Sequence, residues 1–256
     1  MRLIDSHCHL DLSAFDSDRD VVLKTALDSG VTDLIVPAVQ ASTWGKLQLL
    51  SAQYNPAQVH AAYGLHPVFD QHHSIGDLLL LEQQLNSTDC IAVGECGLDF
   101  FIDEYDKDSQ LSYFIGQLDL AVQFQLPVII HSRKSLDLVL KEIRLRPSLT
   151  GVVHSYSGSL QQAKQLIDVG FYLGFGGPIT YPRASKLRGL IVALPLEALL
   201  LETDAPDQPD MSKHGQRNEP AWLPSIAECV AELRGCSVET VAEVTTQNCQ
   251  QLFALN

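Results

Sequence analysis

The sequence is short of basic residues. It holds 17 Lys and Arg against 31 Asp and Glu, which gives a formal net charge of −14 at pH 7. Proteins that coat nucleic acid without regard to sequence need a net positive surface, so this class is excluded. A nucleic-acid substrate would therefore have to be held by a local group of cations.

Long apolar runs and paired cysteines are missing as well. No stretch approaches the roughly 18 apolar residues of a membrane span, and the chain does not start with a basic segment followed by an apolar one. None of the six cysteines belongs to a CxxC pair, which indicates reduced thiols rather than a disulfide framework. These absences predict a cytoplasmic protein with no membrane partner, and nothing in the sequence indicates an obligate protein partner.

What the chain does contain is an alternation of strand and helix patterns. Short apolar, β-rich runs occur at RLIDSH, DLIVPAV, VHAAYGL, CIAVGE, PVIIH, GVVH, FYLGFG and ALLLE. Helical periodicity occupies 21–27, 110–125 and 135–145, and two further helices are expected at 221–233 and 238–255. Apolar strands separated by helices favour a parallel sheet buried on both faces. Eight such units predict a single (β/α)8 TIM barrel over 1–256, with extra C-terminal helices; a doubly wound open sheet is the alternative.

The opening residues, MRLIDSHCHLDL, carry an unusual number of metal-capable side chains. Asp5, His7, His9 and Asp11 recur at every second position. If the first strand continues through them, all four lie on one face. Two imidazoles placed in this way can bind a single ion.

Candidate metal ligands follow five of the eight strand patterns. They are His7, His9, Glu95, His131, His154 and Asp204. The carboxyl ends of the strands surround one mouth in a barrel, so these residues should converge there. Four imidazoles and two carboxylates exceed what one tetrahedral ion needs, which predicts two divalent ions per subunit that share a carboxylate.

The donor set also indicates the metal and the reaction. Imidazole favours zinc, manganese or iron, with magnesium as the alternative. Two ions about 3.5–4 Å apart lower the pKa of a bridging water. The predicted reaction is hydrolysis of a phosphodiester, an ester or an amide by a metal-bridged hydroxide.

An ordered set of motifs over nearly the whole chain resembles the TatD-type metal-dependent hydrolases of the amidohydrolase superfamily, and within them the YjjV branch. The motifs are DSHCHLD (5–11), GLHP (64–67), VGECGLDF (93–100), PVIIHSR (127–133), VVHSYSGS (152–159), GGPITYPRASK (176–186), LLLETDAP (199–206) and RNEP (217–220). The resemblance implies one ion bound by His7, His9, Glu95 and Asp204. It implies a second ion bound by Glu95, His131 and His154, so that Glu95 is the bridge.

The resemblance further implies that His66 and Arg133 face the substrate. Arg133 would clamp a phosphate oxygen in a bidentate manner. The alternatives are that His66 caps a turn before Pro67 and that Arg133 pairs with a surface carboxylate. Glu202 and Asp5 are expected to support the ligands, and the alternative for Asp5 is that it begins the strand's polar rim. His72 and His73 are expected to be exposed.

The chain departs from the better-known deoxyribonucleases of this family. GLDF replaces the usual GLDY, SYSG replaces the usual phenylalanine form, and Asp207 and Asp210 add negative charge beside the metals. A basic rim around the mouth is predicted from Arg133, Lys134, Arg183, Lys186, Lys213 and Arg217. Phe100, Phe101, Tyr156 and Tyr181 are the candidates for base stacking. Such a rim suits a short single-stranded nucleic acid or a small phosphate-bearing substrate rather than a duplex.

The expected function is therefore that of a deoxyribonuclease-like phosphodiesterase that acts from a 3′ end, with Asp204 as ligand and catalytic base. One alternative is an ester or amide hydrolase, for example an aminoacyl-tRNA deacylase. The other is a metalloprotein scaffold without catalytic activity. The intact set of six ligands favours an enzyme.

Overall fold

Eight parallel strands form a nearly closed barrel in the computed structural model, which describes residues 1–54, 59–74 and 76–255. The strands are β1 (Leu3–Asp5), β2 (Val31–Pro37), β3 (Val59–Tyr63), β4 (Ala92–Asp99), β5 (Val128–Arg133), β6 (Gly151–Val153), β7 (Phe171–Phe175) and β8 (Leu199–Leu201). Each pairs with the next in chain order. The amide of Ser6 donates to the carbonyl of Leu201 at 3.0 Å, which brings the last strand back to the first. The predicted barrel is confirmed, and the open sheet is wrong.

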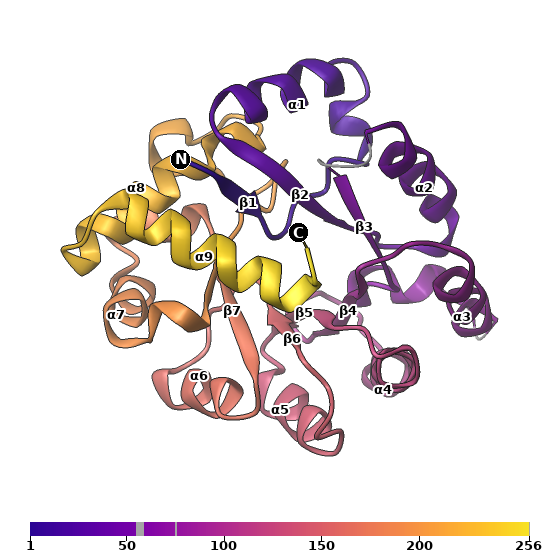
Figure 1. The fold of residues 1–256 in the computed structure, drawn as a ribbon. Coiled ribbons are helices and arrows are strands. Elements are labelled where there is room, and N and C mark those ends of the chain that lie inside the picture. The colour runs from indigo at the N-terminus through magenta and orange to yellow at the C-terminus, as the bar shows by residue number, and fades with distance from the viewer. Residues whose placement is uncertain (55–58, 75, 256) are drawn as a thin grey trace.

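Helices surround the strands on the outside (Figure 1). They are α1 (Arg19–Asp28), α2 (Trp44–Gln53), α3 (Asp77–Ser87), α4 (Lys107–Phe124), α5 (Leu136–Arg144), α6 (Leu160–Ile167), α7 (Ser185–Ala193), α8 (Leu223–Arg234) and α9 (Val238–Phe253). Short 3-10 turns lie at Ser13–Phe15, Ala41–Thr43, Pro67–His72, Gly177–Thr180, Leu196–Ala198, Met211–Lys213 and Pro220–Trp222. Within the described ranges, no helix has both the length and the apolar character to cross a membrane.

Local sequence signals explain several helix ends. The Asp106 side chain accepts hydrogen bonds from the amides of Asp108 and Ser109 and so caps the N-terminus of α4. Gln125 adopts a left-handed conformation directly after this helix and ends it before Pro127. The predicted helix at 110–125 therefore begins three residues earlier than its apolar periodicity suggests, because its first turn is polar.

Two strands end at positions that the sequence does not reveal. β1 stops at Asp5, so the prediction that four alternating residues share a strand face is wrong, and His7 and His9 lie in the loop beyond it. β4 does not end at Glu95 but continues to Asp99. Its register with β5 shifts between Val93 and Cys96, and Glu95 lies in this irregularity. Bulges of this kind re-aim a side chain, and here the carboxylate enters the barrel.

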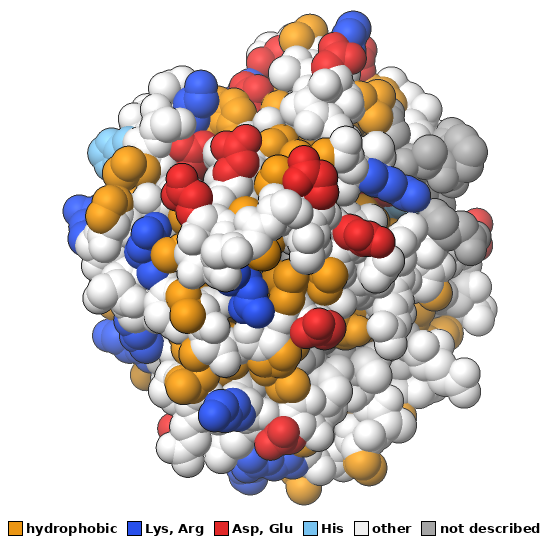
Figure 2. Space-filling model, turned by 60° about the vertical axis from the view of Figure 1, so that its left-hand side comes forward, with side chains coloured by type: hydrophobic (Ala, Val, Ile, Leu, Met, Phe, Trp, Pro, Cys, Tyr) orange, Lys and Arg blue, Asp and Glu red, His pale blue; other side chains and the backbone are white. Residues whose placement is uncertain are grey.

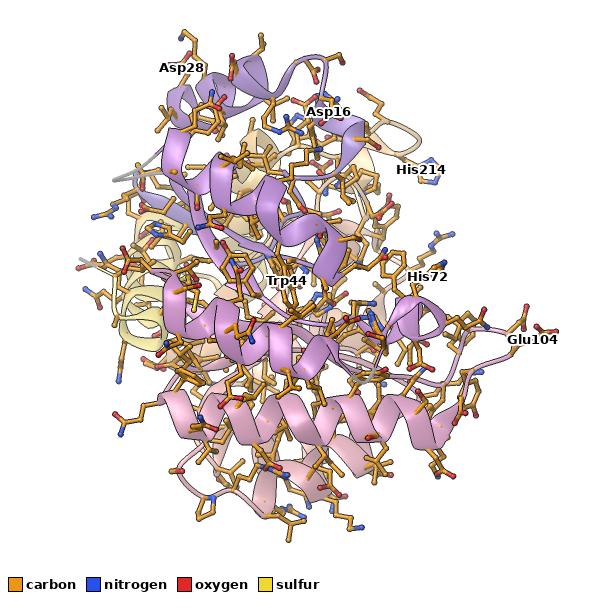
Figure 3. All side chains as sticks on the ribbon, turned by 90° about the vertical axis from the view of Figure 1, so that its right-hand side faces the viewer. Asp16, Asp28, Trp44, His72, Glu104 and His214 are labelled. Atoms are coloured by element: carbon orange, nitrogen blue, oxygen red, sulfur yellow. The ribbon has the colours of Figure 1, made fainter. Side chains whose placement is uncertain are left out.

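The N-terminal end of the barrel is filled with apolar side chains. Ile4, Ile35, Ala62, Ala92, Ile129, Val152 and Leu200 form one buried cluster with Cys249, Leu252 and Phe253 of α9. Figure 1 shows α9 lying across this end of the barrel. Figure 3 shows the opposite end, where His72, Glu104 and His214 lie on loops that point away from α9. The C-terminal mouth is therefore the end left for a functional site.

Candidate metal centre

Glu95 lies at the centre of a ring of imidazoles in the mouth. Its side chain is buried, and its oxygens lie 2.8–3.4 Å from a ring nitrogen of His7, His9, His66, His131 and His154. Neither oxygen has a hydrogen-bond partner among the described residues. Four strands or the loops that follow them (β1, β3, β5 and β6) thus place five ring nitrogens against one carboxylate, as the barrel topology predicts.

The outer hydrogen bonds of two histidines determine which nitrogen faces Glu95. His9 Nδ1 lies 3.2 Å from the carbonyl oxygen of Pro37, which only accepts, so Nδ1 carries the proton. His131 Nε2 lies 2.9 Å from Asp99 Oδ2 and likewise donates. In the neutral ring, the other nitrogen of each histidine then presents a lone pair to the centre. Partners of this kind fix metal-binding histidines in their working tautomer.

His7 and His154 stack on each other beside Glu95, with ring centroids 3.9 Å apart and planes at 9°. Their Nε2 atoms lie 3.2 Å and 2.8 Å from the Glu95 carboxylate. Both Nδ1 atoms and Glu202 Oε2 are buried without a hydrogen-bond partner in the described chain, and His154 Nδ1 lies 3.8 Å from Glu202 Oε1. Glu202 Oε1 accepts from the amide of Ser155 at 2.5 Å. Burial raises the pKa of Glu202 to about 8, as suits the buried supporting carboxylate that the sequence predicts.

The charges of this group fit bound cations. Burial alone would raise the pKa of Glu95, but the surrounding imidazoles hold it well below its usual range. Burial would lower the pKa values of His9 and His154, but the carboxylate outweighs it and raises them to about 9 and about 10. Ring nitrogens of His7 and His9 face each other at 3.2 Å, as do those of His131 and His154. Two pairs of converging ring nitrogens around one carboxylate match the donors of two divalent ions.

Asp204 completes the ring from the β8 side. Its Oδ1 lies 3.6 Å from His7 Nε2 and 3.7 Å from His9 Nε2. Gln208 Nε2 donates to the other oxygen, Oδ2. Asp204 has a left-handed backbone with φ 57°, and its amide donates to the carbonyl of His7 at 2.8 Å. All six predicted ligands therefore lie in one group, and their roles as ligands remain a proposal.

His66 differs from His9 and His131 in the kind of nitrogen that it turns toward Glu95. Its Nδ1 accepts a hydrogen bond from the amide of Val68 at 3.1 Å, so this nitrogen carries no proton. Burial lowers the pKa of His66, which favours the neutral ring. The proton is therefore on Nε2, which lies 3.0 Å from Glu95 Oε1. His66 caps its turn and at the same time presents an N–H, rather than a lone pair, to the mouth.

Asp99 is a residue of the site that the sequence reasoning missed. It is fully buried, accepts from His131 and from the amide of Phe101, and lies 3.7 Å from the guanidinium of Arg133. The signal was present, because Asp99 follows Glu95 at an even spacing within one strand. Arg133 itself is half-exposed and lies over the ring of Phe101 at 4.2 Å. It thus lines the mouth and also contacts a carboxylate, although a buried one rather than the surface one considered above.

The remaining predicted residues have structural partners. Asp5 is buried and accepts from the amide of His7 and from the amide and hydroxyl of Thr203, which joins the ends of β1 and β8. His72 is exposed as predicted. The prediction of an exposed His73 is wrong, because its Nε2 contacts the carbonyl of His66 at 2.9 Å and its side chain is half-buried.

The pocket at the mouth has a volume of about 590 Å³ and includes Glu95, four of its histidines, Arg133 and Asp204. Of the six predicted rim cations, Arg133 alone is among the lining residues of this pocket. Arg217 is held by Asp18 and Glu219 at 2.7 and 2.9 Å, and Lys213 lies over Trp222. Asp207 lines the pocket as expected. Asp210 is turned away and caps the following turn through the amide of Ser212.

Comparisons with known proteins agree with this geometry. The family described as TatD related DNase matches residues 4–254. The chain is 42% identical to an uncharacterized metal-dependent hydrolase, YjjV of Escherichia coli K12, over 98% of both chains. The crystal structure of YjjV superposes with a TM-score of 0.95 at 40% identity and covers 100% of this chain and 99% of its own.

A second similar protein is an uncharacterized metal-dependent hydrolase of Haemophilus influenzae, 39% identical over 99% of this chain and 100% of its own. A third, from Danio rerio, is 35% identical over 98% of this chain and 97% of its own, and its name gives deoxyribonuclease as a provisional activity. The match over almost the whole sequence, together with the ring of histidines and carboxylates at the barrel mouth, shows that this chain belongs to the TatD family of metal-dependent hydrolases.

Proposed function

We propose that the protein is a deoxyribonuclease-like phosphodiesterase that shortens a single strand from its 3′ end with two divalent ions at the barrel mouth. The observation that carries the proposal is the pair of facing imidazole nitrogens on each side of the Glu95 carboxylate. A shared carboxylate between two groups of nitrogen donors suits a two-ion site for hydrolysis.

The ligands divide into two groups around Glu95. One ion would be held by His7, His9, Glu95 and Asp204, and the other by Glu95, His131 and His154. Zinc, manganese or iron suit these donors best, with magnesium as the alternative. When bound, such ions supply Lewis acidity toward a phosphodiester and lower the pKa of a water molecule.

Three side chains of the mouth would act on the substrate directly. Asp204 is the partly exposed carboxylate of the ring, with side-chain exposure of 14% against 1% for Glu95. It can therefore accept the proton of the attacking water. His66 would donate its Nε2–H to an oxygen of the substrate, and the Arg133 guanidinium would hold a non-bridging phosphate oxygen at the rim.

The size of the pocket favours a strand end over a duplex. A volume of about 590 Å³ lies within the range of small-ligand sites. The family to which the chain belongs is described as TatD related DNase, which supports nucleic acid as the substrate class. An ester or amide substrate, such as an aminoacyl-tRNA, would need the same Lewis acidity and is therefore included in the test.

The test is hydrolysis by the purified protein loaded with Mn²⁺, Zn²⁺ or Mg²⁺. The substrates are a 5′-labelled single-stranded oligonucleotide, a chromogenic phosphodiester, a phosphomonoester, a carboxylic ester and an aminoacyl-tRNA. We expect progressive shortening of the oligonucleotide from its 3′ end. Hydrolysis of the ester or the aminoacyl bond alone would overturn the phosphodiesterase assignment.

A matched variant excludes a contaminating nuclease. Asp204→Asn keeps the shape of the side chain, and Asn tolerates the left-handed backbone found there. It should retain much of the metal and lose on the order of 10²–10⁴ in kcat, the scale of a positioned general base. If Asp204→Asn keeps its metals and stays within a factor of about three of wild-type kcat, well short of that scale, Asp204 serves only as a ligand.

A further inference from the structure

A second cavity adjoins the metal pocket and has the opposite charge to the rest of the molecule. Its volume is about 850 Å³, and the loops after β4, β5 and β6 contribute to its walls. Four lysines line it, namely Lys107, Lys134, Lys141 and Lys186. One of its lining residues is acidic, Asp137, and that carboxylate accepts a hydrogen bond from Gln162 at 2.7 Å. We refer to this cavity as the lysine cleft.

The lysine cleft and the metal pocket share a wall. Ser132, Tyr156 and Ser157 line both cavities. Ser132 lies near the end of β5, and Tyr156 and Ser157 follow β6; the same two strands bring His131 and His154 to the mouth. A chain that leaves the metal pocket across this wall would enter the lysine cleft directly.

Local contacts hold three of the ammonium groups in place without neutralising them. Lys186 Nζ donates to the carbonyl of Ser157 at 2.7 Å. Lys134 and Lys107 lie over the rings of Phe101 and Phe100, at 4.4 and 5.7 Å from the centroids. Within the part of the chain that the structure describes, none of these three ammonium groups forms an ion pair with a carboxylate.

The fourth lysine and the aromatic rings extend the same surface. Lys141 lies 3.9 Å from Glu142, and its side chain is 69% exposed, so this pairing is weak. Phe100 stacks on Tyr105 with centroids 5.1 Å apart, and Phe101 is 53% exposed. Lysines that alternate with accessible rings are what a single strand needs, because phosphates bind the cations and bases stack on the rings.

The distribution of charge over the surface agrees with this placement. Figure 2 shows Lys and Arg gathered on the left and lower parts of the face, whereas most Asp and Glu lie on its upper part. The chain as a whole carries −14. A cavity lined by four lysines next to the mouth therefore draws a polyanion toward the site while the rest of the molecule repels it.

We propose that the lysine cleft binds the phosphate backbone of the single strand whose 3′ end is hydrolysed in the metal pocket. The inference rests on the proposed function and adds the path of the substrate. Phosphates on the 5′ side of the scissile bond would contact the lysines, and the bases would meet Phe100 and Phe101. A substrate too short to cross the wall at Ser157 would not reach the lysine cleft.

The test compares two triple variants that remove equal charge. The cleft variant combines Lys107→Ala, Lys141→Ala and Lys186→Ala and so removes three cations from the lysine cleft. The control combines Lys24→Ala, Arg144→Ala and Lys164→Ala, which are exposed residues on α1, α5 and α6 outside the cleft. Fluorescence anisotropy measures the binding of a labelled oligonucleotide of about ten nucleotides, a length within the range of single-strand sites. Both variants carry Asp204→Asn in this measurement, so that binding does not depend on turnover.

We expect the cleft variant to weaken binding of this strand by at least tenfold and the control by less than twofold, as surface charges distant from a ligand are screened. The slope of log K against log salt should become shallower by about 2, since each phosphate contact contributes about 0.7 for a single strand. With Asp204 unchanged, the cleft variant should hydrolyse the small chromogenic phosphodiester at the same rate as the wild type.

The outcomes separate this inference from the proposed function. If no phosphodiester is hydrolysed with any metal, the proposed function fails, and the anisotropy measurement still tests the cleft. Equal strand binding by the cleft variant and the wild type would overturn the inference while the hydrolysis result stands. If the cleft variant loses as much affinity for a dinucleotide as for the longer strand, the cleft is a site for small phosphates instead. If it loses as much affinity for a duplex, the single-strand path is overturned.

Discussion

The two ends of the barrel are built from the same eight strands but hold opposite kinds of side chain. At the N-terminal end, apolar residues from seven strands pack against Leu252 and Phe253 of α9. At the C-terminal end, carboxylates and imidazoles are buried with unpartnered oxygens and nitrogens in the described chain. Burial of apolar surface stabilises the fold, whereas burial of charge costs free energy unless an ion or a partner compensates it. The comparison teaches that one end holds the barrel together and the other is arranged for a ligand.

Glu95→Ala should produce the largest effect and mark the mouth as the functional end. It removes the ligand common to both ions, so at least one ion should be lost and turnover should fall below detection. The metal-free variant should fold, because its histidines become neutral once the carboxylate is absent. Metal analysis, kinetics and thermal unfolding test this, with Asp33→Asn at the opposite end of the barrel as a control that keeps its metals. Full activity with normal metal content would contradict the bridging role.

Phe253→Ala, at the N-terminal end, should lower the stability of the fold and leave activity and metal content unchanged. Truncation of a buried Phe costs about 3–5 kcal/mol and lowers Tm by about 6–20 °C in a domain of this size. At a temperature well below Tm, kcat and metal content should match the wild type. The control is Leu49→Ala at an exposed position on α2, which should change the free energy of unfolding by no more than about 0.5 kcal/mol. Loss of activity in folded Phe253→Ala would show that the two ends are not independent.

Asp99→Ala should have an intermediate effect at the mouth. It removes the acceptor for His131 Nε2, so the ring can turn and its Nδ1 lone pair no longer points at the centre. Metal affinity should fall about 10–100-fold, the usual cost of losing such a support. Asp99→Asn retains an acceptor oxygen and should recover part of the affinity in a competition assay with a chelator. Equal affinities in all three proteins would leave Asp99 without a role in positioning.

The pH dependence of metal binding tests the charge of the ring without any substitution. Glu95 raises the pKa values of His9 and His154 to about 9 and about 10, although burial opposes it, so both hold protons at pH 7 without metal. An ion must displace these protons, and affinity should therefore rise with pH from 7 toward 9, by about tenfold per unit for each proton released. Calorimetry at pH 7 in buffers of different ionisation enthalpy counts the protons. Metal binding without proton release would contradict these pKa directions.

The sequence by itself predicted the barrel and most of the imidazoles and carboxylates that meet at its mouth. Continuous apolar strands separated by helices leave few other architectures, and in a barrel the residues after each strand must meet. His7, Glu95, His131, His154 and Asp204 could thus be grouped from their positions alone. The predicted helices at 221–233 and 238–255 also correspond to α8 and α9, because their apolar spacing reflects burial against the barrel.

Only the tertiary structure decided how those residues are presented. That His9 and His131 offer lone pairs whereas His66 offers an N–H depends on Pro37, Asp99 and Val68, which contact them from other loops and strands. The cations of the predicted basic rim are likewise separated by the partners that folding brings to them. Lys134 and Lys186 line a neighbouring cleft, Lys213 lies over Trp222, and Arg217 is bound by Asp18 across a separation of 199 residues. The position of a residue along its strand determines which end of the barrel it reaches, whereas its tautomer, charge and direction depend on partners that are brought close only by folding.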